Sequence, residues 1–580
     1  MEKNENKNLT GYPSVDKPWL KYYSEDLINT PLPSATIYEH MYQQNRDYPQ
    51  DIAISYLGRE ISYKNLFQNI ENAAKAFITA GVKCGDIVTV ALPSVPEALY
   101  SLYALNKIGA VANMIHPLAG QTDLIFYLRE SGSKVVVLFD VTYESLRDVL
   151  SRTNVRLAVV VSAGDSLPFG LKQLYFLKNP RKSLPKDGSA VLWQSFIQAG
   201  EKTPIPQIRK DPETMAVISH TGGTTGSPKG VMCSDNSINA MIVMTGQILS
   251  PVRQERAMAV LPPFINYSLV NSMLEPIAFG VTCVLIPKYE PERFFEYMKK
   301  YKPNYIVSIP PYWEALLQLP EPASLDLSCL KVGIYGGESM AKQNETAINE
   351  FLLSHGAKNR LSTGLGMTEV ICAATLTSFE HDMTGSVGIP LPQVTCKIVV
   401  PEEETECSYG QDGEICYGGP TLMIGYYHNQ QATDDVVKVH KDGIRWIHSG
   451  DLGHIDENGI LYITGRIKRI VMTKGKDGNI TKLFPVRIEE AINSHPAVRV
   501  SCVIGIKDEE RVNYPRAIIE LNDNFTASEE LSEEIMEHCR RHLPDYSLPD
   551  EIVFRETLPR TPRGKVDYRA LEKEVLLSEG

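Results

Sequence analysis

Residues 219–230 read "SHTGGTTGSPKG" and come directly after an apolar run at 215–218. Glycines let backbone N–H groups approach an anion closely, hydroxyls add neutral donors, and Lys229 supplies a compact positive charge. The stretch is not a Walker A loop, because two residues separate Gly226 from the lysine. It also lacks the G-x-G-x-x-G fingerprint of dinucleotide-binding folds. Taken alone, it fits either a polyphosphate cradle or a polar surface loop.

Length and charge narrow the class of protein. The chain has 580 residues, more than one hydrophobic core usually organises, so two or more domains are expected. With 43% hydrophobic and 22% charged residues, its composition is that of an ordinary soluble globular protein. The net charge of -12 argues against a general nucleic-acid surface. An anionic ligand must therefore meet local positive charge.

Cysteine usage and hydropathy bear on location. The ten cysteines are scattered singly without a C-x-x-C pair, which fits a reducing compartment better than a disulfide scaffold. The first residues lack the apolar core of a signal peptide, and no run of about 18 apolar residues occurs, so no transmembrane segment is expected. A cytoplasmic enzyme is the expectation. Peripheral membrane association and oligomeric state stay open.

The first part of the chain alternates strand and helix patterns. Residues 53–63, "AISYLGREISY", predict a β-hairpin around Gly58, and a helix follows through residue 77. After a strand at 86–93, the spacing of Ser94 and Glu97 predicts a capping box on the next helix. Further short apolar strands alternate with helical segments as far as residue 336. This alternation predicts layered α/β structure with much parallel sheet.

From residue 394 the pattern changes to short alternating strands with Gly and Asp turns, which predicts a β-rich subdomain over 394–466. A new unit of helices and strands then begins. We therefore expect an α/β protein with a large N-terminal domain at 1–466 and a small, mobile C-terminal α+β domain at 467–580.

Four further segments resolve the ambiguity of the first. They are "GIYGGES" at 333–339, "GLGMTEV" at 364–370, "IHSGDLGHIDENGILYITGRIKRI" at 447–470 and "LPRTPRGKVDYRAL" at 558–571. In this order, after the loop at 219–230, they resemble the acyl-adenylate-forming (AMP-binding) superfamily, and most closely its acyl-CoA synthetase and fatty-acid–CoA ligase type. The resemblance covers nearly the whole chain. It implies that a carboxylate attacks the α-phosphate of ATP, releasing pyrophosphate, and that a thiol then takes the acyl group from the acyl-adenylate.

The resemblance also implies roles for individual residues. Thr368 would donate to the α-phosphate, Glu369 would ligate Mg²⁺, and Lys565 would join the substrate carboxylate to the α-phosphate, where two anions otherwise repel. The β- and γ-phosphates would lie on Thr221, Gly222, Gly223, Thr224, Thr225, Gly226 and Lys229. Adenosine would lie against Gly336, Gly337, Glu338, Leu365 and Gly366, with its ribose on Asp451 and Arg466. Singly, each of these residues has a plain alternative as a turn, cap or surface residue.

Several positions depart from the pattern of many relatives. Leu365 stands where an adenine-stacking tyrosine is common, and Asp235 stands where a histidine is common. The segment "LPPFINYSL" places Ile265, Asn266 and Tyr267 beside the expected acyl pocket and thiol tunnel, and it offers no carboxylate to pair with an ammonium. An amino acid substrate is therefore disfavoured.

The expected hinge between the domains is Arg469. Positive charge gathers around it, and Lys474 and Gly475 are candidates for binding CoA, with a solvated charged face as the plain alternative. The leading hypothesis is a ligase that uses ATP, Mg²⁺ and CoA to convert a medium- or long-chain fatty acid into acyl-CoA, AMP and pyrophosphate. The alternative is an acyl-AMP ligase that loads an acyl or aryl acid onto the phosphopantetheine of a carrier protein. A catalytically silent sensor ranks below both, because Lys565 and Glu369 are present.

Overall fold

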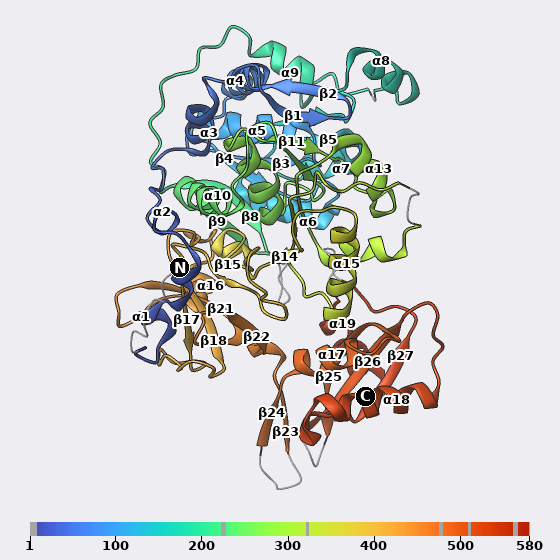
Figure 1. Cartoon of the computed structure of the whole chain (residues 1–580). Coiled ribbons are helices and arrows are strands. Elements are labelled where there is room, and N and C mark those ends of the chain that lie inside the picture. Colours follow the sequence, from blue (N-terminus) through green and yellow to red (C-terminus); the bar gives the residue numbers. More distant parts are fainter. Residues whose placement is uncertain are drawn as a thin grey trace.

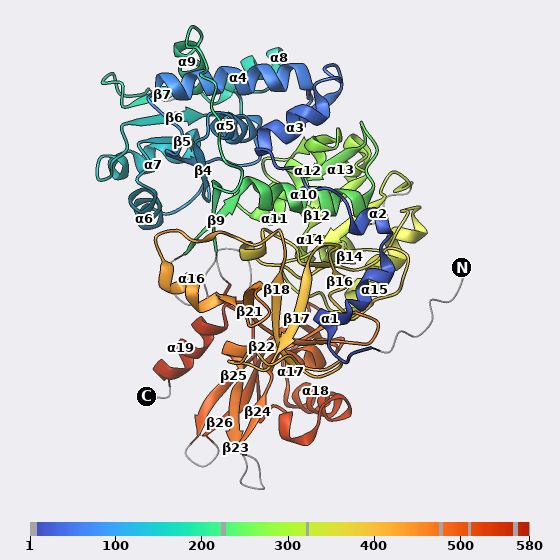
Figure 2. The same ribbon diagram turned by 90° about the vertical axis from the view of Figure 1, so that its left-hand side faces the viewer.

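The computed structural model describes residues 9–181, 183–221, 228–320, 324–474, 480–508, 512–560 and 566–578. Figures 1 and 2 show a large layered body, a small β-sheet unit below it, and a separate unit formed by the last part of the chain. The expected α/β class with two unequal parts agrees with this architecture. Among the described residues, no helix has the length and apolarity needed to cross a membrane.

The first sheet of the large body has eight strands within the described residues and is parallel from β7 through β8. Two antiparallel strands, β9 and β19, extend it at one edge. In spatial order the strands are β19 (Gly425–Tyr426), β9 (Gly230–Ser234), β8 (Met215–His220), β4 (Val111–Met114), β3 (Ile87–Ala91), β5 (Val135–Phe139), β6 (Leu157–Val161) and β7 (Ala190–Leu192).

The second sheet has seven described strands, parallel except for the edge strand β2. The hairpin expected at 53–63 is confirmed as β1 and β2. In spatial order the strands are β14 (Ser362–Thr363), β13 (Val332–Tyr335), β12 (Tyr305–Ser308), β10 (Arg256–Ala259), β11 (Thr282–Leu285), β1 (Ile52–Tyr56) and β2 (Arg59–Ser62).

Helices cover these sheets, and one core cluster joins residues from both of them. The helices of the first half are α1 (Pro13–Asp16), η1 (Pro18–Tyr22), α2 (Glu25–Ile28), α3 (Ile37–Asn45), α4 (Tyr63–Thr79), α5 (Pro96–Lys107), α6 (Gln121–Ser131), α7 (Asp140–Leu150), α8 (Phe169–Lys178), α9 (Trp193–Ala199) and α10 (Asp235–Leu249). Those that follow are α11 (Asn266–Ser268), the π-helical η2 (Leu269–Leu274), α12 (Glu275–Ala278), η3 (Pro291–Arg293), α13 (Phe294–Tyr301), α14 (Pro310–Glu314), η4 (Ala315–Gln318), α15 (Lys342–Ser354) and η5 (Thr368–Val370).

The capping box expected at Ser94 and Glu97 is wrong. Helix α5 has Val95 as its N-cap, without a side-chain cap. The Ser94 hydroxyl instead donates to the carbonyl of Leu261 (3.3 Å), and the buried Glu97 accepts from Ser166 (2.6 Å). Both residues form tertiary hydrogen bonds because α5 is buried along nearly its whole length. Local spacing therefore did not decide their partners.

The β-rich part lies beside the large body and is an antiparallel sheet, in agreement with the pattern seen from residue 394. Its strands are β17 (Thr395–Val399), β18 (Gly413–Gly418), β21 (Arg445–Ile455), β20 (Val437–Val439) and β22 (Leu461–Arg466), accompanied by helix α16 (Gln430–Val436). A short two-stranded sheet, β15 (Thr375–Leu376) and β16 (Ile389–Pro390), lies just before it in sequence.

The last part of the chain has a separate core around Ile488, Val503 and Ile535. It contains η6 (Ile467–Arg469), the hairpin β23 (Val471–Lys474) and β24 (Ile480–Leu483), and α17 (Pro485–Asn493). The three-stranded sheet of β25 (Val498–Asp508), β26 (Val512–Leu521) and β27 (Glu551–Arg555) is packed with α18 (Glu529–His542), η7 (Asp545–Ser547) and α19 (Tyr568–Ser578). Figure 1 shows this unit joined to the β-rich sheet by the segment after β22.

Candidate active site

One cavity of about 720 Å³ collects most of the residues singled out in the sequence. It is lined by segments from both large sheets, from the β-rich sheet and from the start of the last unit. Of the predicted residues, the cavity wall contains Thr221, Lys229, Ile265, Asn266, Tyr267, Gly336, Gly337, Leu365, Gly366, Thr368, Glu369, Arg466 and Arg469. Residues more than 200 positions apart in sequence thus share one space.

The remaining predicted residues fall into two groups. Glu338, Asp451 and Lys474 are described but are not part of the cavity wall, although Asp451 contacts Arg466, which is. The other group lies outside the described residues and comprises Gly222, Gly223, Thr224, Thr225, Gly226, Gly475 and Lys565.

The loop at 219–230 joins two antiparallel strands, β8 and β9. At its base the backbone N–H of Thr221 donates to the carbonyl of Lys229 (2.9 Å). The loop therefore rises from the end of a hairpin, and its two described ends both lie on the cavity wall.

Tyr426 connects the lysine of this loop to the acidic residue predicted to hold metal. The Lys229 ammonium lies 4.6 Å from the centre of the Tyr426 ring, and the Tyr426 hydroxyl donates to Glu369 Oε1 (2.6 Å). Burial, followed by the charge of Glu369, raises the pKa of Tyr426, so the hydroxyl keeps its proton. Sequence reasoning missed Tyr426, and β19, the short strand that carries it, has no motif of its own.

Glu369 is buried and held from two sides. Besides the tyrosine, its own carbonyl accepts from the backbone N–H of Met423 (2.8 Å). Glu369 Oε2 accepts no hydrogen bond from any described residue, and the side chain lines the cavity. A carboxylate with one oxygen engaged and one open is a suitable ligand for a hard cation such as Mg²⁺.

The turn after Glu369 is strained. Ile371 has φ of 71° and ψ of -59°, a conformation that costs free energy for a β-branched residue. The N–H of Cys372 donates to the Val370 carbonyl (3.0 Å), closing a tight turn around Ile371. Such strain persists where the surroundings over-determine the backbone, and here it lies beside the cavity.

Packing is close at two of the predicted glycines, and at Gly366 it excludes any side chain. A Cβ at Gly366 would collide with the carbonyl oxygen of Cys372, and one at Gly336 would lie 3.1 Å from the hydroxyl of Tyr267. Gly337 has φ of +85°, which glycine adopts readily. These positions let bare backbone form the cavity wall, as a flat aromatic ligand requires.

Asp451 is buried, and Arg466 reaches it from the neighbouring strand. Arg466 Nε donates to Asp451 Oδ1 (2.5 Å), and the two residues face each other in the β21–β22 ladder. The guanidinium is about half exposed, whereas the carboxylate is almost fully covered. The arginine therefore screens an acidic group at the rim of the cavity.

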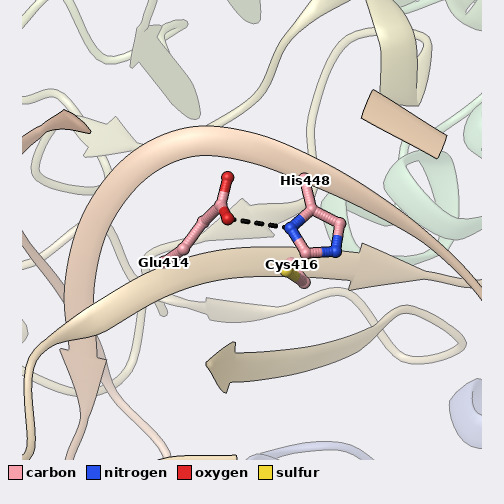
Figure 3. Close-up of side chains that lie close together, drawn as sticks. All are labelled: Glu414, Cys416 and His448. Carbon is pink, nitrogen blue, oxygen red and sulfur yellow. Dashed lines mark hydrogen bonds and ion pairs between the residues drawn. The ribbon is translucent and has the colours of Figure 1, made fainter. Parts of the chain in front are cut away.

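A cluster of Glu414, Cys416 and His448 lies just before Asp451 in the same sheet, and Figure 3 shows the three side chains together. Its ligand atoms lie within 4.8 Å of one another, as in a metal site. Both Glu414 oxygens are nevertheless engaged, Oε2 with His448 Nδ1 (2.8 Å) and Oε1 with the N–H of Gly450 (3.0 Å). The cluster thus holds the turn that precedes Asp451 by its own hydrogen bonds.

The apolar side of the cavity, where the sequence predicts the acyl pocket, is built on α11 and the segment before it. Asn266 is turned away from a substrate role, because its Oδ1 accepts from the Ser219 hydroxyl and its Nδ2 donates to Cys233 Sγ (3.4 Å). The wall on this side is mainly apolar or aromatic, and it includes Leu249, Leu261, Phe264, Ile265, Tyr267 and Ile309.

Arg469 is mostly buried and links the cavity to the last unit of the chain. It donates to both oxygens of Glu489 on α17 (3.1 and 2.5 Å) and to the carbonyl of Val503 on β25 (3.2 Å), and it lies 4.9 Å from the ring centre of Tyr568. Burial disfavours its charge, but the attraction of Glu489 outweighs burial and raises the pKa of Arg469. Arg469 is thus fastened to the last unit while lining the cavity.

Asp235, a departure without a sequence explanation, has a structural role. It is fully buried and accepts from the Lys210 ammonium (2.7 Å), the Asn106 amide (2.6 Å) and the Ile37 N–H (2.9 Å). The carboxylate therefore ties three distant segments together at the start of α10.

Comparison with known families agrees with this geometry. The profile described as "AMP-binding enzyme" matches residues 41–427, and that of the "AMP-binding enzyme C-terminal domain" matches residues 487–565. The chain belongs to the AMP-binding enzyme family. The expected class, an AMP-forming acid–thiol ligase, is confirmed at that level by the family and by the CoA ligases among its relatives.

Two curated relatives align along almost the whole chain. A long-chain-fatty-acid–CoA ligase of Bacillus subtilis is 29% identical over 568 residues, covering 96% of this chain and 98% of its own. A probable 4-coumarate–CoA ligase 1 of Dictyostelium discoideum is 27% identical over 555 residues, covering 94% and 96%.

Solved structures show the same fold. The anthranilate CoA ligase AuaEII in complex with anthranoyl-AMP has a TM-score of 0.78 at 21% identity, over 94% of this chain and 98% of its own. An ATP-bound RpMatB–BxBclM chimera has a TM-score of 0.79 at 22% identity, over 93% and 99%. The α/β fold with a large N-terminal and a small C-terminal domain is thereby confirmed.

Proposed function

We propose that this AMP-binding enzyme activates a medium- or long-chain fatty acid with ATP and transfers the acyl group to CoA. The observation that carries the proposal is the single cavity in which Lys229, Glu369, Gly336 and Arg466 meet an apolar wall. A polyphosphate needs charged groups such as Lys229 and Glu369, a nucleoside needs surroundings such as Gly336 and Arg466, and a hydrocarbon chain needs the apolar wall. The fatty-acid–CoA ligases among the relatives support the same substrate class.

The phosphate end would lie between the loop at 219–230 and Glu369. In the first step, a substrate carboxylate oxygen forms a bond to the α-phosphorus, and the bond to pyrophosphate breaks with its electron pair leaving on the pyrophosphate. Lys229, with the loop N–H groups and hydroxyls, would stabilise that departing charge. Glu369 would hold Mg²⁺, whose charge offsets that of the phosphate oxygens.

Adenosine would lie against the bare backbone of Gly336, Gly337 and Gly366. The ribose hydroxyls would donate to Asp451, whose carboxylate has acceptor sites for two donors, after Arg466 moves aside or shares it. Leu365 in place of an aromatic residue would leave adenine held by aliphatic packing rather than by stacking.

Lys565 would neutralise repulsion between the substrate carboxylate and the α-phosphate. We place the domain boundary between residues 466 and 467 and the hinge at Arg469, so that the C-terminal domain can withdraw Lys565 after adenylation. In the second step the thiol gives up its proton to water and its sulfur bonds to the acyl carbon. The bond from that carbon to the AMP oxygen breaks, and its electron pair leaves on AMP. Lys474 and Gly475 are the proposed contacts for CoA.

Carboxylate-dependent ATP–pyrophosphate exchange tests the first step. A panel of short, medium and long alkanoic acids, aryl acids and amino acids should give exchange that is strongest with longer alkanoic acids. Lys565→Ala should reduce exchange by about 10² to 10³-fold, the range for losing one stabilising donor. The matched control, Lys573→Ala, removes an exposed lysine of the same domain and should leave exchange unchanged. Absence of exchange with every acid would overturn the proposal.

The second candidate acceptor is the phosphopantetheine of a carrier protein, and an aryl acid is the second candidate substrate. The aryl-acid enzymes among the relatives and structural neighbours support an aryl acid as the second candidate substrate. Supplying preformed acyl-AMP with either CoA or a holo carrier protein separates the acceptors. Thioester formed on CoA supports the leading proposal, whereas thioester formed only on the carrier supports the alternative.

A further inference from the structure

Helix α8 exposes a large apolar surface. Phe169 is 79% exposed, Leu177 is 80% exposed, and Leu171 and Leu174 are about half exposed. At 100° per residue these four side chains fall within an arc of about 200° on the helix, an arc that also holds the polar Gln173 and Lys178. No residue of α8 is buried, so the helix turns an apolar face outward where a core helix would turn it inward.

The opposite face fixes this orientation. Tyr175 and Phe176 pack on Gly164, where a Cβ would collide with the tyrosine ring. The Lys172 ammonium donates to the Asp165 carbonyl (2.7 Å), and Arg181 both pairs with the Asp165 carboxylate (2.6 Å) and covers the ring of Phe176. The apolar arc is therefore held outward by contacts to the turn before the helix.

The charge around this face is the reverse of that of the whole chain. Residues 165–187 contain five lysines and arginines and two aspartates, one of which pairs with Arg181, so the segment is net positive in a chain with net charge -12. Lys178 and Lys186 are exposed. Exposed apolar side chains beside fixed positive charge complement a surface that is apolar underneath and anionic on top.

The position of α8 leaves it accessible to a flat surface. In Figures 1 and 2 the helix lies at the end of the large body that is remote from the C-terminal unit. A second copy of the chain is a poor occupant, because two basic faces repel and a ten-residue helix covers far less than the roughly 1,200 Å² of a stable interface.

We propose that α8 and the basic segment after it dock the enzyme on an anionic lipid bilayer. The helix would lie in the interface plane with Phe169 and Leu177 among the acyl chains and with Lys178 and Lys186 at the headgroups. This surface stands on observations independent of the proposed function.

Vesicle co-sedimentation of the full chain tests this. Wild type should bind phosphatidylcholine vesicles that contain phosphatidylglycerol, and bind phosphatidylcholine alone at least tenfold more weakly. The double change Phe169→Ser with Leu177→Ser should reduce binding at least tenfold. The matched control, Val252→Ser with Phe525→Ser, removes exposed apolar side chains elsewhere and should bind as wild type.

Charge is tested separately. Lys178→Glu with Lys186→Glu should remove the preference for anionic vesicles, whereas Lys64→Glu with Lys299→Glu, at exposed positions elsewhere, should not. Leu177→Trp keeps the apolar surface and adds a fluorescent probe. If the helix enters the bilayer, brominated acyl chains should quench the fluorescence of this tryptophan. The proposal would be overturned if wild type did not bind vesicles, or if the fluorescence of the Leu177→Trp variant were not quenched. It would also be overturned if wild type were a dimer and the serine variant a monomer, because the apolar surface would then join two copies of the chain.

Discussion

Tyr426 is the residue on which the geometry of the phosphate end depends most directly. Tyr426→Phe keeps the ring beside Lys229 but removes the hydrogen bond to Glu369 (2.6 Å). A bond to a charged group contributes about 1.5 to 3 kcal/mol, so adenylation should fall about tenfold or more and require more Mg²⁺. The measurement is pyrophosphate exchange titrated with Mg²⁺.

The neighbouring tyrosine provides the control for this substitution. Tyr427 is half-buried and stacks on His428 instead of contacting Glu369. Tyr427→Phe should therefore leave the Mg²⁺ titration unchanged. If Tyr426→Phe also left it unchanged, the bridge from Lys229 to Glu369 would have no part in positioning the carboxylate.

Glu275 should make stability depend on pH. Its carboxyl is buried beside the Thr245 hydroxyl (2.5 Å), and burial raises its pKa from 4.5 to about 8. Because the folded pKa lies above the unfolded one, its contribution is full below pH 4.5 and is lost as pH rises toward 8. Glu275→Gln, which cannot ionise, should therefore gain stability relative to wild type across that window, by an amount on the order of a few kcal/mol.

Urea unfolding at several pH values measures this difference. Glu97 also has a pKa raised by burial, to about 7, so Glu97→Gln should show a similar gain completed at lower pH. A constant offset for Glu275→Gln would mean that the carboxyl is already ionised in the folded protein.

Some residues of the candidate site could be predicted from a short sequence motif, and others could not. Thr368 and Glu369 could be predicted because they lie in one short motif, and Lys229 because a glycine-rich loop precedes it. Tyr426 and Asp235 could not, because their partners lie 57 and 129 positions away in Glu369 and Asn106. No spacing within a segment reports such a pair.

At the scale of elements, the sequence predicted strands better than helix ends. The hairpin of β1 and β2 followed from alternation around Gly58, which has φ of +94°. The capping box at Ser94 was wrong, whereas a real one joins Thr36 and Glu39 at the start of α3. The two pairs have the same spacing. Only their tertiary contacts explain why Thr36 and Glu39 form a capping box and Ser94 and Glu97 do not.

The segment between the two domains should be sensitive to one ion pair. Arg469 and Glu489 are mostly buried, so Glu489→Ala would leave an unpaired charge and should destabilise the C-terminal unit by about 3 to 5 kcal/mol. Hydrogen exchange of α17 and β25 measures the effect locally. The exposed pair of Arg487 and Asp412 provides the contrast. Arg487→Ala breaks it while leaving the contact of Asp412 with His454, and should cost less than about 1 kcal/mol.

Glu489→Gln gives a graded version of the same change. In wild type the N–H of Val503 donates to Glu489 Oε1 (2.7 Å). Glutamine keeps an acceptor for this N–H but loses the negative charge that faces Arg469. Its effect should fall between those of wild type and Glu489→Ala. Equal exchange rates in all three proteins would show that the pair does not hold the unit in place.

At the scale of the whole molecule, the cavity is an assembly of parts that lie far apart in the chain. Its wall draws on the end of β8 with Thr221 and Lys229, on the segment from Gly364 to Ala373, on the β-rich sheet and on η6. A ligand that fills it therefore contacts every major unit at once. Its binding free energy adds to the stability of the assembly rather than of one part.

A stable mimic of the acyl-adenylate, in which a sulfamate replaces the phosphate, should therefore stabilise the whole chain. At a concentration of 100 times its Kd the expected gain is about 2.7 kcal/mol. Asp451→Ala removes the proposed ribose acceptor and should lose most of that gain at the same concentration, whereas Asp434→Ala, an exposed change on α16, should keep it. Thermal and urea unfolding with and without the mimic measure both. Equal stabilisation of the two variants would place the ribose elsewhere than on Asp451.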